Sequence, residues 1–588
     1  MTPDIQMQPA PETKPPLPTN PFGVLSIRDW LYLPHLLGGR ERALLAFFVA
    51  LALISGSAAA ILGFIKITKA APKAGGIFRE GVIRPPERIN PLFLSDNDTD
   101  RDISALIFGN LFYYDADDKL QPEIAEEYSV SEDGKSYVVT LKKNVSWHDG
   151  QPLTADDVVY TVKTIQDPAY KSSLRPNWQG VTIERLGEYE VRFVLHQPYS
   201  PFVQNLALPI IPQHIWKRVP AEAAFLVEAN LKPVGAGPYR FSNFERNSDG
   251  VITKYVLKAV DTFYLEGPYI KTIELKVYNT EEDLLKAFQN GDIDGISILS
   301  SKNVERVKNL GAAVSAIRIP RILAVFLNEA HPALADRAVR QALAMAIDKQ
   351  ELITSVLGGG ATVIESPIPP GTFGYNPDIP SADFAPDSAR AMLEKAGWQD
   401  LNNDGLREKK PAKRGGSPTP LKIVLATSDW RDLAESANMI KNYWRQIGVE
   451  TEVKTIPINE LESSVIRPRA YDALLFGEIF GHDPDPFAFW HSSQLKDPGL
   501  NIALYHSKKV DSLLEEARRM TDRSATEARY REFQDVIAGD FPSIFLYSPV
   551  YSYATRSTVQ GVNLKSLVLP SERFNAARLW YIKTKRVF

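Results

Sequence analysis

The acids and histidines between residues 478 and 491 are the side chains best suited to chemistry. His482, Asp483, Asp485 and His491 offer nitrogen and oxygen atoms of the kinds that bind metal ions. Prolines interrupt this stretch and make it a loop, and no regular spacing sets two ligands on one helix face. A capped turn is therefore favoured over a metal site.

Other motifs that carry chemistry are incomplete. Asp400, Asn402, Asp404 and Gly405 resemble the first half of a calcium-binding loop, but the position that needs a bidentate glutamate holds Pro411. The sequence contains no nucleophile elbow, no His-Glu-x-x-His and no complete phosphate-binding loop. We therefore predict a protein that is not an enzyme, with no catalytic residue, no cofactor and no metal site.

A strand–helix–strand unit is the clearest element able to position functional groups. Residues 421–427 form an apolar run, and Leu433, Ala437, Ile440 and Trp444 then recur at helical spacing before Gly448. A second strand follows at 449–456. This pattern predicts a parallel crossover, hence an α/β domain whose ligand-facing loops follow the carboxyl ends of the strands.

Local turn and cap signals predict further elements. Asp133-Gly134 predicts the turn of a β-hairpin over residues 128–141. Thr154 is a typical helix cap, with Asp156 and Asp157 in the first turn. Asp348 and Glu351 have the spacing of a capping box for a helix that ends at Gly358.

Composition limits the partners of the protein. The formal net charge is −4 with mixed signs throughout, which argues against nucleic acid, because phosphate binding needs a basic face. The chain has no cysteine, which removes disulfides, thiol catalysis and a lipid-modified cysteine. Aromatic residues make up 10% of the chain, as expected of a globular protein rather than a disordered one.

One uncharged apolar run, residues 43–65, precedes this globular region. At about 1.5 Å per residue, a helix of that length spans the ~30 Å hydrocarbon core of a bilayer. The run predicts a single membrane anchor, and the alternative is a cleaved signal peptide with its small residues at 55–60. Basic residues are balanced on the two flanks, so charge does not decide which side the large domain occupies.

Several segments, taken in order, carry motifs that occur together in one known family. The most specific is YVVTLKKNVSWHDGQPLTADD at 137–157. GAGPYRF at 235–241 and FQNGDID at 288–294 follow, then VRQALAMAID at 339–348 and Pro369-Pro370. In this order the segments resemble the solute-binding proteins of ABC importers, in the dipeptide/oligopeptide class of family 5, and the resemblance extends over residues 75–588.

This resemblance implies an α/β, bilobed, periplasmic-binding-protein-like clamp (type II, cluster C) with an inserted subdomain, preceded by one transmembrane helix. The ligand lies between the lobes, and hinge closure buries it. The implied boundaries are a disordered, cytoplasmic tail at 1–42, the anchor at 43–65, a tether at 66–76, a first lobe at 77–312 with the inserted subdomain at about 115–200, a second lobe at 313–546 and a return to the first lobe at 547–588.

The resemblance also implies where a peptide is held. The loop after the strand at 421–427 supplies groups near the ligand carboxylate, with Arg431 as the salt-bridge donor or, equally well, a solvated arginine at a helix start. The family's amine-binding segment reads GEIFGHDPD here and lacks the usual tryptophan. The candidate ligand-binding residues are Asp96, Ser428, Asp429, Trp430, Arg431, Glu478, Phe480, His482, Asp483 and Asp485.

We therefore expect a membrane-anchored, monomeric substrate-binding protein. Its domain lies on the extracellular or periplasmic side, captures a peptide ligand and delivers it to an ABC permease. Two alternatives remain open: a binding protein for nickel or an oligosaccharide, and a surface hydrolase or peptidase.

Overall fold

The computed structural model describes residues 37–93, 97–411, 416–520 and 522–587. The chain divides into two compact units, residues 1–71 with 584–588 and residues 72–583. Residues 1–36, most of the predicted tail, lie outside the described residues, and so does the candidate Asp96.

The first unit contains α2 (Gly39–Ile67), which includes the whole apolar run. Phe47, Phe48, Leu53 and Ile54 are 60–67% exposed. A helix that is apolar all round and covered by no protein has the character of a membrane span. Gly39–Phe64 is long and apolar enough to cross a bilayer, although a signal sequence meets the same criteria.

The segment predicted as a tether, residues 66–76, is partly regular structure. α2 continues to Ile67, and Lys69–Lys73 then forms β1. β1 pairs with β23 (Lys583–Val587) in a two-stranded sheet. The segment that follows the apolar helix is therefore held by the end of the chain.

A sheet of twelve strands organises the second unit. Its strand order is β20-β19-β21-β14-β22-β12-β2-β11-β10-β9, and β13 and β15 pair with β22 off this path. The bounds are β2 Ile77–Val82, β9 Tyr239–Arg246, β10 Ile252–Ala259, β11 Thr272–Val277, β12 Gly295–Ile296, β13 Ala312–Arg318, β14 Arg321–Leu327, β15 Ala361–Val363, β19 Lys422–Ser428, β20 Glu450–Ile456, β21 Ala473–Ile479 and β22 Ser543–Arg556.

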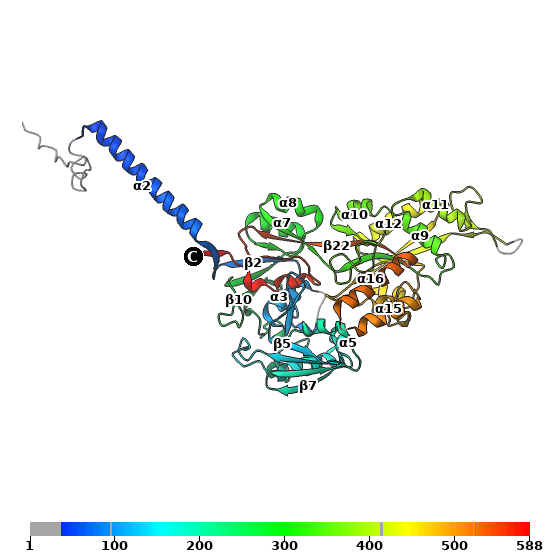
Figure 1. Cartoon of the computed structure of the whole chain (residues 1–588), viewed down its shortest axis with the longest axis horizontal. Helices are drawn as coiled ribbons and strands as arrows, with labels where there is room; N and C mark the ends of the chain where they lie inside the picture. The colour runs from blue at the N-terminus through cyan, green and yellow to red at the C-terminus, as the bar shows by residue number, and fades with distance from the viewer. Residues whose placement is uncertain (1–36, 94–96, 412–415, 521, 588) are drawn as a thin grey trace, which may run out of the picture. The chain divides into compact units, whose positions relative to one another are not determined.

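The long strand β22 joins two halves of this sheet, one that contains β14, β21, β19 and β20 and one that contains β12, β2, β11, β10 and β9 (Figure 1). Its first part pairs with β14, from Ser543 to Tyr547, and its second part pairs with β13, from Val550 to Arg556. The chain also crosses between the halves where β13 leads into β14. Each crossing carries a proline, Pro320 or Pro549, which donates no backbone hydrogen bond.

The predicted crossover is confirmed. β19 and β20 are parallel, with Lys422 opposite Glu450 and Ser428 opposite Ile456. α12 (Arg431–Gln446) connects them and buries the predicted apolar face, including Trp444, whose Nε1 donates to the carbonyl of Leu343 at 3.1 Å. Strand β14, which lies between β21 and β22, is buried on both faces, which explains its continuous apolar sequence ILAVFL.

The smaller sheets and the helices complete the second unit. A four-stranded antiparallel sheet, β5-β6-β8-β7, lies within the region predicted as an inserted subdomain, and its β5–β6 hairpin turns at Gly134 as predicted (φ 66°). Its strands and those of the two short sheets are β3 Phe112–Tyr114, β4 Leu120–Pro122, β5 Ala125–Val130, β6 Ser136–Leu141, β7 Thr182–Gly187, β8 Glu190–Val194, β16 Trp398–Gln399, β17 Glu408–Lys409 and β18 Thr419–Pro420. The α-helices are α3 Asp98–Ile107, α4 Ala155–Gln166, α5 Arg175–Trp178, α6 Gln213–Trp216, α7 Glu281–Asn290, α8 Val304–Asn309, α9 Arg337–Met345, α10 Lys349–Leu357, α11 Pro386–Lys395, α13 Ile458–Leu461, α14 Phe487–Trp490, α15 Lys508–Arg519 and α16 Arg523–Asp540.

Asp348 caps α10 as predicted, and its carboxylate accepts from the Glu351 amide at 2.8 Å. The other capping-box bond, from the Asp348 amide to the Glu351 carboxylate, is replaced, because Glu351 accepts from the Tyr443 hydroxyl at 2.6 Å instead.

We expect Asp348→Ala to lower the free energy of unfolding by about 1 kcal/mol, since one amide at the helix start loses its partner. Urea denaturation measures this, and Asp348→Asn, which keeps an accepting oxygen, should stay close to wild type.

Candidate ligand-binding site

The carboxyl ends of three parallel strands form one edge of the sheet. β21 is parallel to β19, with Leu475 opposite Thr427, and β19 is parallel to β20. Ligands of open α/β sheets bind beyond the carboxyl ends of the strands. This edge is therefore the place where the predicted site residues should meet.

Large apolar side chains are exposed at this edge. Trp430, just after β19, is 57% exposed, Ile458, just after β20, is 37% exposed, and Ile479, at the end of β21, is 51% exposed. Exposed apolar groups at the ends of adjacent strands make this edge a candidate binding surface.

The residues predicted to hold a ligand carboxylate already have internal contacts. The Asp429 carboxylate accepts from the Ile458 amide at 3.1 Å, which ties the ends of β19 and β20 together. Ser428 is fully buried, and its hydroxyl lies 3.4 Å from the Trp430 amide. Arg431 donates to Glu435 at 2.8 Å and is exposed. The ligand-binding role of this loop stays a prediction.

Arg321 is a candidate that sequence reasoning missed. It begins β14, opposite Ile479, and its Nε is buried without a hydrogen-bond partner among the described residues. Burial lowers the pKa of Arg321, and the carboxylate of Asp98 in α3 acts in the opposite direction. A single arginine at the head of an otherwise apolar strand was the signal in the sequence.

Glu478 pairs with Ile322, one position along from the pair formed by Arg321 and Ile479, so its side chain lies on the opposite face of the sheet from Arg321. It is 3% exposed, and neither carboxylate oxygen has a hydrogen-bond partner among the described residues. Burial raises the pKa of Glu478 well above its usual value, and no other group opposes this shift.

His482 follows β21 and contacts the part of the chain predicted as the first lobe. Its Nδ1 lies 2.5 Å from Asp118 and its Nε2 lies 3.3 Å from Glu572, while its ring stacks on Tyr114 with the centroids 3.6 Å apart. Burial lowers the pKa of His482, but the two carboxylates outweigh this effect and raise it to about 9. The charged imidazolium thus links segments that are distant in the sequence.

The other predicted ligand-binding residues of this loop, Phe480, Asp483 and Asp485, are largely buried. Asp485 forms an ion pair with Arg518 at 2.5 Å and accepts from the Tyr199 hydroxyl at 3.0 Å. Burial raises the pKa of Asp483 to about 6, against the opposing charge of Arg523. Phe480 is 2% exposed, and its amide donates to the Pro320 carbonyl at 2.9 Å in the crossing segment.

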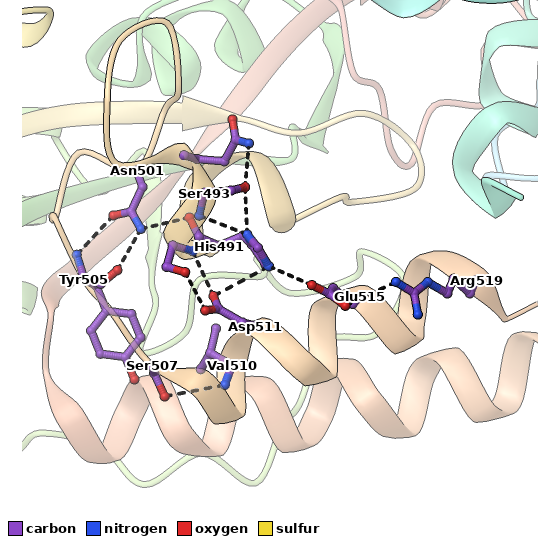
Figure 2. A network of polar contacts seen from close by, with 11 residues as sticks. His491, Ser493, Asn501, Tyr505, Ser507, Val510, Asp511, Glu515 and Arg519 are labelled. Atoms are coloured by element: carbon purple, nitrogen blue, oxygen red, sulfur yellow. Dashed lines mark hydrogen bonds and ion pairs between the residues drawn. The ribbon is translucent and has the colours of Figure 1, made fainter. Parts of the chain in front are cut away.

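His491 lies in a network of polar contacts around the start of α15 (Figure 2). Its Nδ1 lies 2.8 Å from the Ser493 hydroxyl, and its Nε2 lies 3.8 Å from Asp511 and 3.4 Å from Glu515 of α15. No cluster of three or more metal-binding side chains occurs in the part of the chain that the structure describes. The preference for a capped turn over a metal site stays a prediction.

Comparison with known proteins decides the family. The family model described as "Bacterial extracellular solute-binding proteins, family 5 Middle" matches residues 119–499. The chain belongs to this family. Family 5 membership confirms the resemblance found in the sequence, and family 5 proteins act as ABC solute-binding proteins.

Two curated relatives and one solved structure illustrate the similarity. The oligopeptide-binding protein AppA of Bacillus subtilis is 29% identical over 523 residues, which cover 87% of this chain and 93% of AppA. The nickel-binding periplasmic protein of Escherichia coli is 27% identical over 445 residues, which cover 73% of this chain and 81% of that protein. The structure of B. subtilis AppA in complex with a nonapeptide superposes with a TM-score of 0.68 at 27% identity. The superposition covers 87% of this chain and 100% of the AppA chain. The bilobed α/β fold of family 5 is thereby confirmed for this chain.

Proposed function

We propose that this protein is a membrane-anchored extracellular binding protein that captures peptides and delivers them to an ABC importer. The first lobe then comprises residues 77–312 and 547–588, and the second lobe comprises residues 313–546. Its role is binding and release rather than catalysis, and the expected partner is a permease in the same membrane.

The observation that carries this proposal is the exposed apolar edge of the sheet with Arg321 beside it. Arg321 lies opposite the exposed Ile479, and its buried Nε has no hydrogen-bond partner among the described residues. A peptide carries a carboxylate and apolar side chains, so it satisfies both features. The relatives named as peptide-binding proteins support the same ligand class.

Membrane anchoring is supported by the exposed apolar surface of α2 and by the absence of a cysteine that could carry a lipid. The large domain would then remain near its importer. Sequencing the N-terminus of the mature protein tests this point: an intact N-terminus supports the anchor, and cleavage near Ala60 identifies a signal peptide.

Peptide capture is tested with the full chain in detergent. Mass spectrometry of what co-purifies, followed by calorimetry with the peptides recovered, should give intact peptides that bind again to the emptied protein. Turnover of added peptides would indicate a hydrolase, and the absence of any peptide binding would contradict the proposal.

A further inference from the structure

A cavity of about 400 Å³ lies wholly within the predicted second lobe, beside the carboxyl ends of β20 and β21. Ile458, which follows β20, and Glu478, near the end of β21, both line it. The cavity therefore adjoins the carboxyl-end edge of the sheet at these two residues. Its walls are mainly apolar, formed by Leu461, Ile466, Phe476, Phe489, Leu500 and Ile502.

Among the described residues that line this cavity, Glu478 is the buried acid whose two carboxyl oxygens have no hydrogen-bond partner. By contrast, Glu80 and Asp102, two other buried acids of the second unit, both contact Arg573, at 2.9 and 2.5 Å. An unpaired buried carboxyl group is costly, which makes Glu478 a strong candidate for a group that a ligand completes.

The arginines that line the cavity do not pair with Glu478. Arg467 forms an ion pair with Glu462 at 2.8 Å. Arg469 donates through its two Nη atoms to the carbonyls of Ile466 and Gly499, at 2.6 and 2.7 Å, and its Nε is buried without a hydrogen-bond partner among the described residues. Neither arginine is among the groups that shift the pKa of Glu478. The remaining charged group that lines the cavity is Asp497, so a ligand is the remaining source of a positive charge for Glu478.

An alkyl chain that ends in an ammonium group fits this arrangement. Apolar walls take up the methylene groups, and the carboxylate meets the charge at the end of the chain. A free peptide amino terminus fits less well, because the polar peptide group beside it would be buried among apolar side chains.

We propose that the Glu478 cavity binds the side chain of a lysine residue of the captured peptide, with Glu478 as its counter-ion. This inference rests on the proposed peptide-binding function and adds a side-chain specificity to it. Burial raises the pKa of Glu478 and the charge of a bound lysine opposes this shift, so binding should release protons as the ammonium and the carboxylate meet as ions.

The test compares alanine peptides that contain one lysine with the same peptides that contain norleucine, which keeps the alkyl chain and lacks the charge. The wild-type full chain should bind the lysine peptides about tenfold more tightly or better, since one charge-assisted contact contributes 1.4 kcal/mol or more. Calorimetry in buffers of different ionisation enthalpy should show proton release with lysine peptides and none with norleucine peptides.

Two variants separate the charge from the shape of the cavity. Glu478→Gln should lose the preference for lysine and the proton release, while Glu478→Leu should prefer norleucine. Both should remain folded, and Glu478→Leu should unfold at a higher temperature than wild type, because a buried unpaired acid is removed.

The outcomes distinguish the two levels of the proposal. Equal affinity of the wild type for lysine and norleucine peptides, or a lysine preference that survives in Glu478→Leu, would overturn the lysine assignment and leave peptide binding intact. If no peptide of either series binds, the proposed function itself fails.

Discussion

Arg573→Leu is expected to lower the free energy of unfolding by about 3–5 kcal/mol, because it leaves two buried carboxylates without a cation. The Arg573 guanidinium donates to Asp102 at 2.7 and 2.5 Å and to Glu80 at 2.9 Å, and all three side chains are at most 1% exposed. The Tyr553 hydroxyl completes the cluster with a bond to Glu80 at 2.9 Å.

This cluster ties together segments that are far apart in the sequence. Glu80 is in β2, Asp102 is in α3 and Arg573 is in the C-terminal segment predicted to return to the first lobe. Thermal or denaturant unfolding measures the loss. Arg531→Ala is the matched control, because it removes an arginine from an exposed ion pair with Glu527 and should change stability by less than about 1 kcal/mol. A loss as small as that of the control for Arg573→Leu would show that the cluster does not hold these segments together.

The second prediction concerns His482, which links segments predicted to belong to different lobes. We expect His482→Ala to weaken peptide affinity by about 100- to 10,000-fold, because the charged imidazolium bonds two carboxylates of the predicted first lobe and each such bond contributes about 1.5–3 kcal/mol. The change should appear mainly as faster dissociation, since the lost contacts stabilise the closed form. Stopped-flow and calorimetric measurements test this, with the exposed His506→Ala as control.

The same contacts predict a dependence on pH. The pKa of His482 is raised to about 9 in this structure, compared with an ordinary value of 6.5. A raised pKa means that the stabilisation is complete below about pH 6.5 and is lost as the pH rises through 9. Affinity of the wild type should therefore fall between pH 7 and 10 more steeply than that of His482→Ala. Parallel pH profiles for the two proteins would exclude His482 as the source of the effect.

Periodicity and caps were sufficient to predict the elements that build the site. Leu433, Ala437, Ile440 and Trp444 recur at helical spacing between two apolar runs, and the structure places them on α12 between β19 and β20. These signals are local: each depends on residues within one or two turns of the chain. The carboxyl-end edge followed from the parallel pairing alone.

The site itself could be predicted only in part, because its properties depend on distant residues. His482 and Asp485 were predicted as ligand-binding candidates, but their partners Asp118, Glu572 and Tyr199 lie far away in the sequence. Glu478 and Arg321 stand out because they lack partners, and a missing partner cannot be seen without the packing around it. Arg431, by contrast, has an ion-pair partner, Glu435, only four residues along the same helix.

The placement of the Glu478 cavity within one lobe has a consequence for the order of events. A ligand side chain contacts every group that lines this cavity before the other lobe has moved. Selection between peptides should therefore occur during initial binding to the open form and not during hinge closure. Peptides that fail there leave from the open form, and the subsequent closing step should run at the same rate for all the peptides that remain.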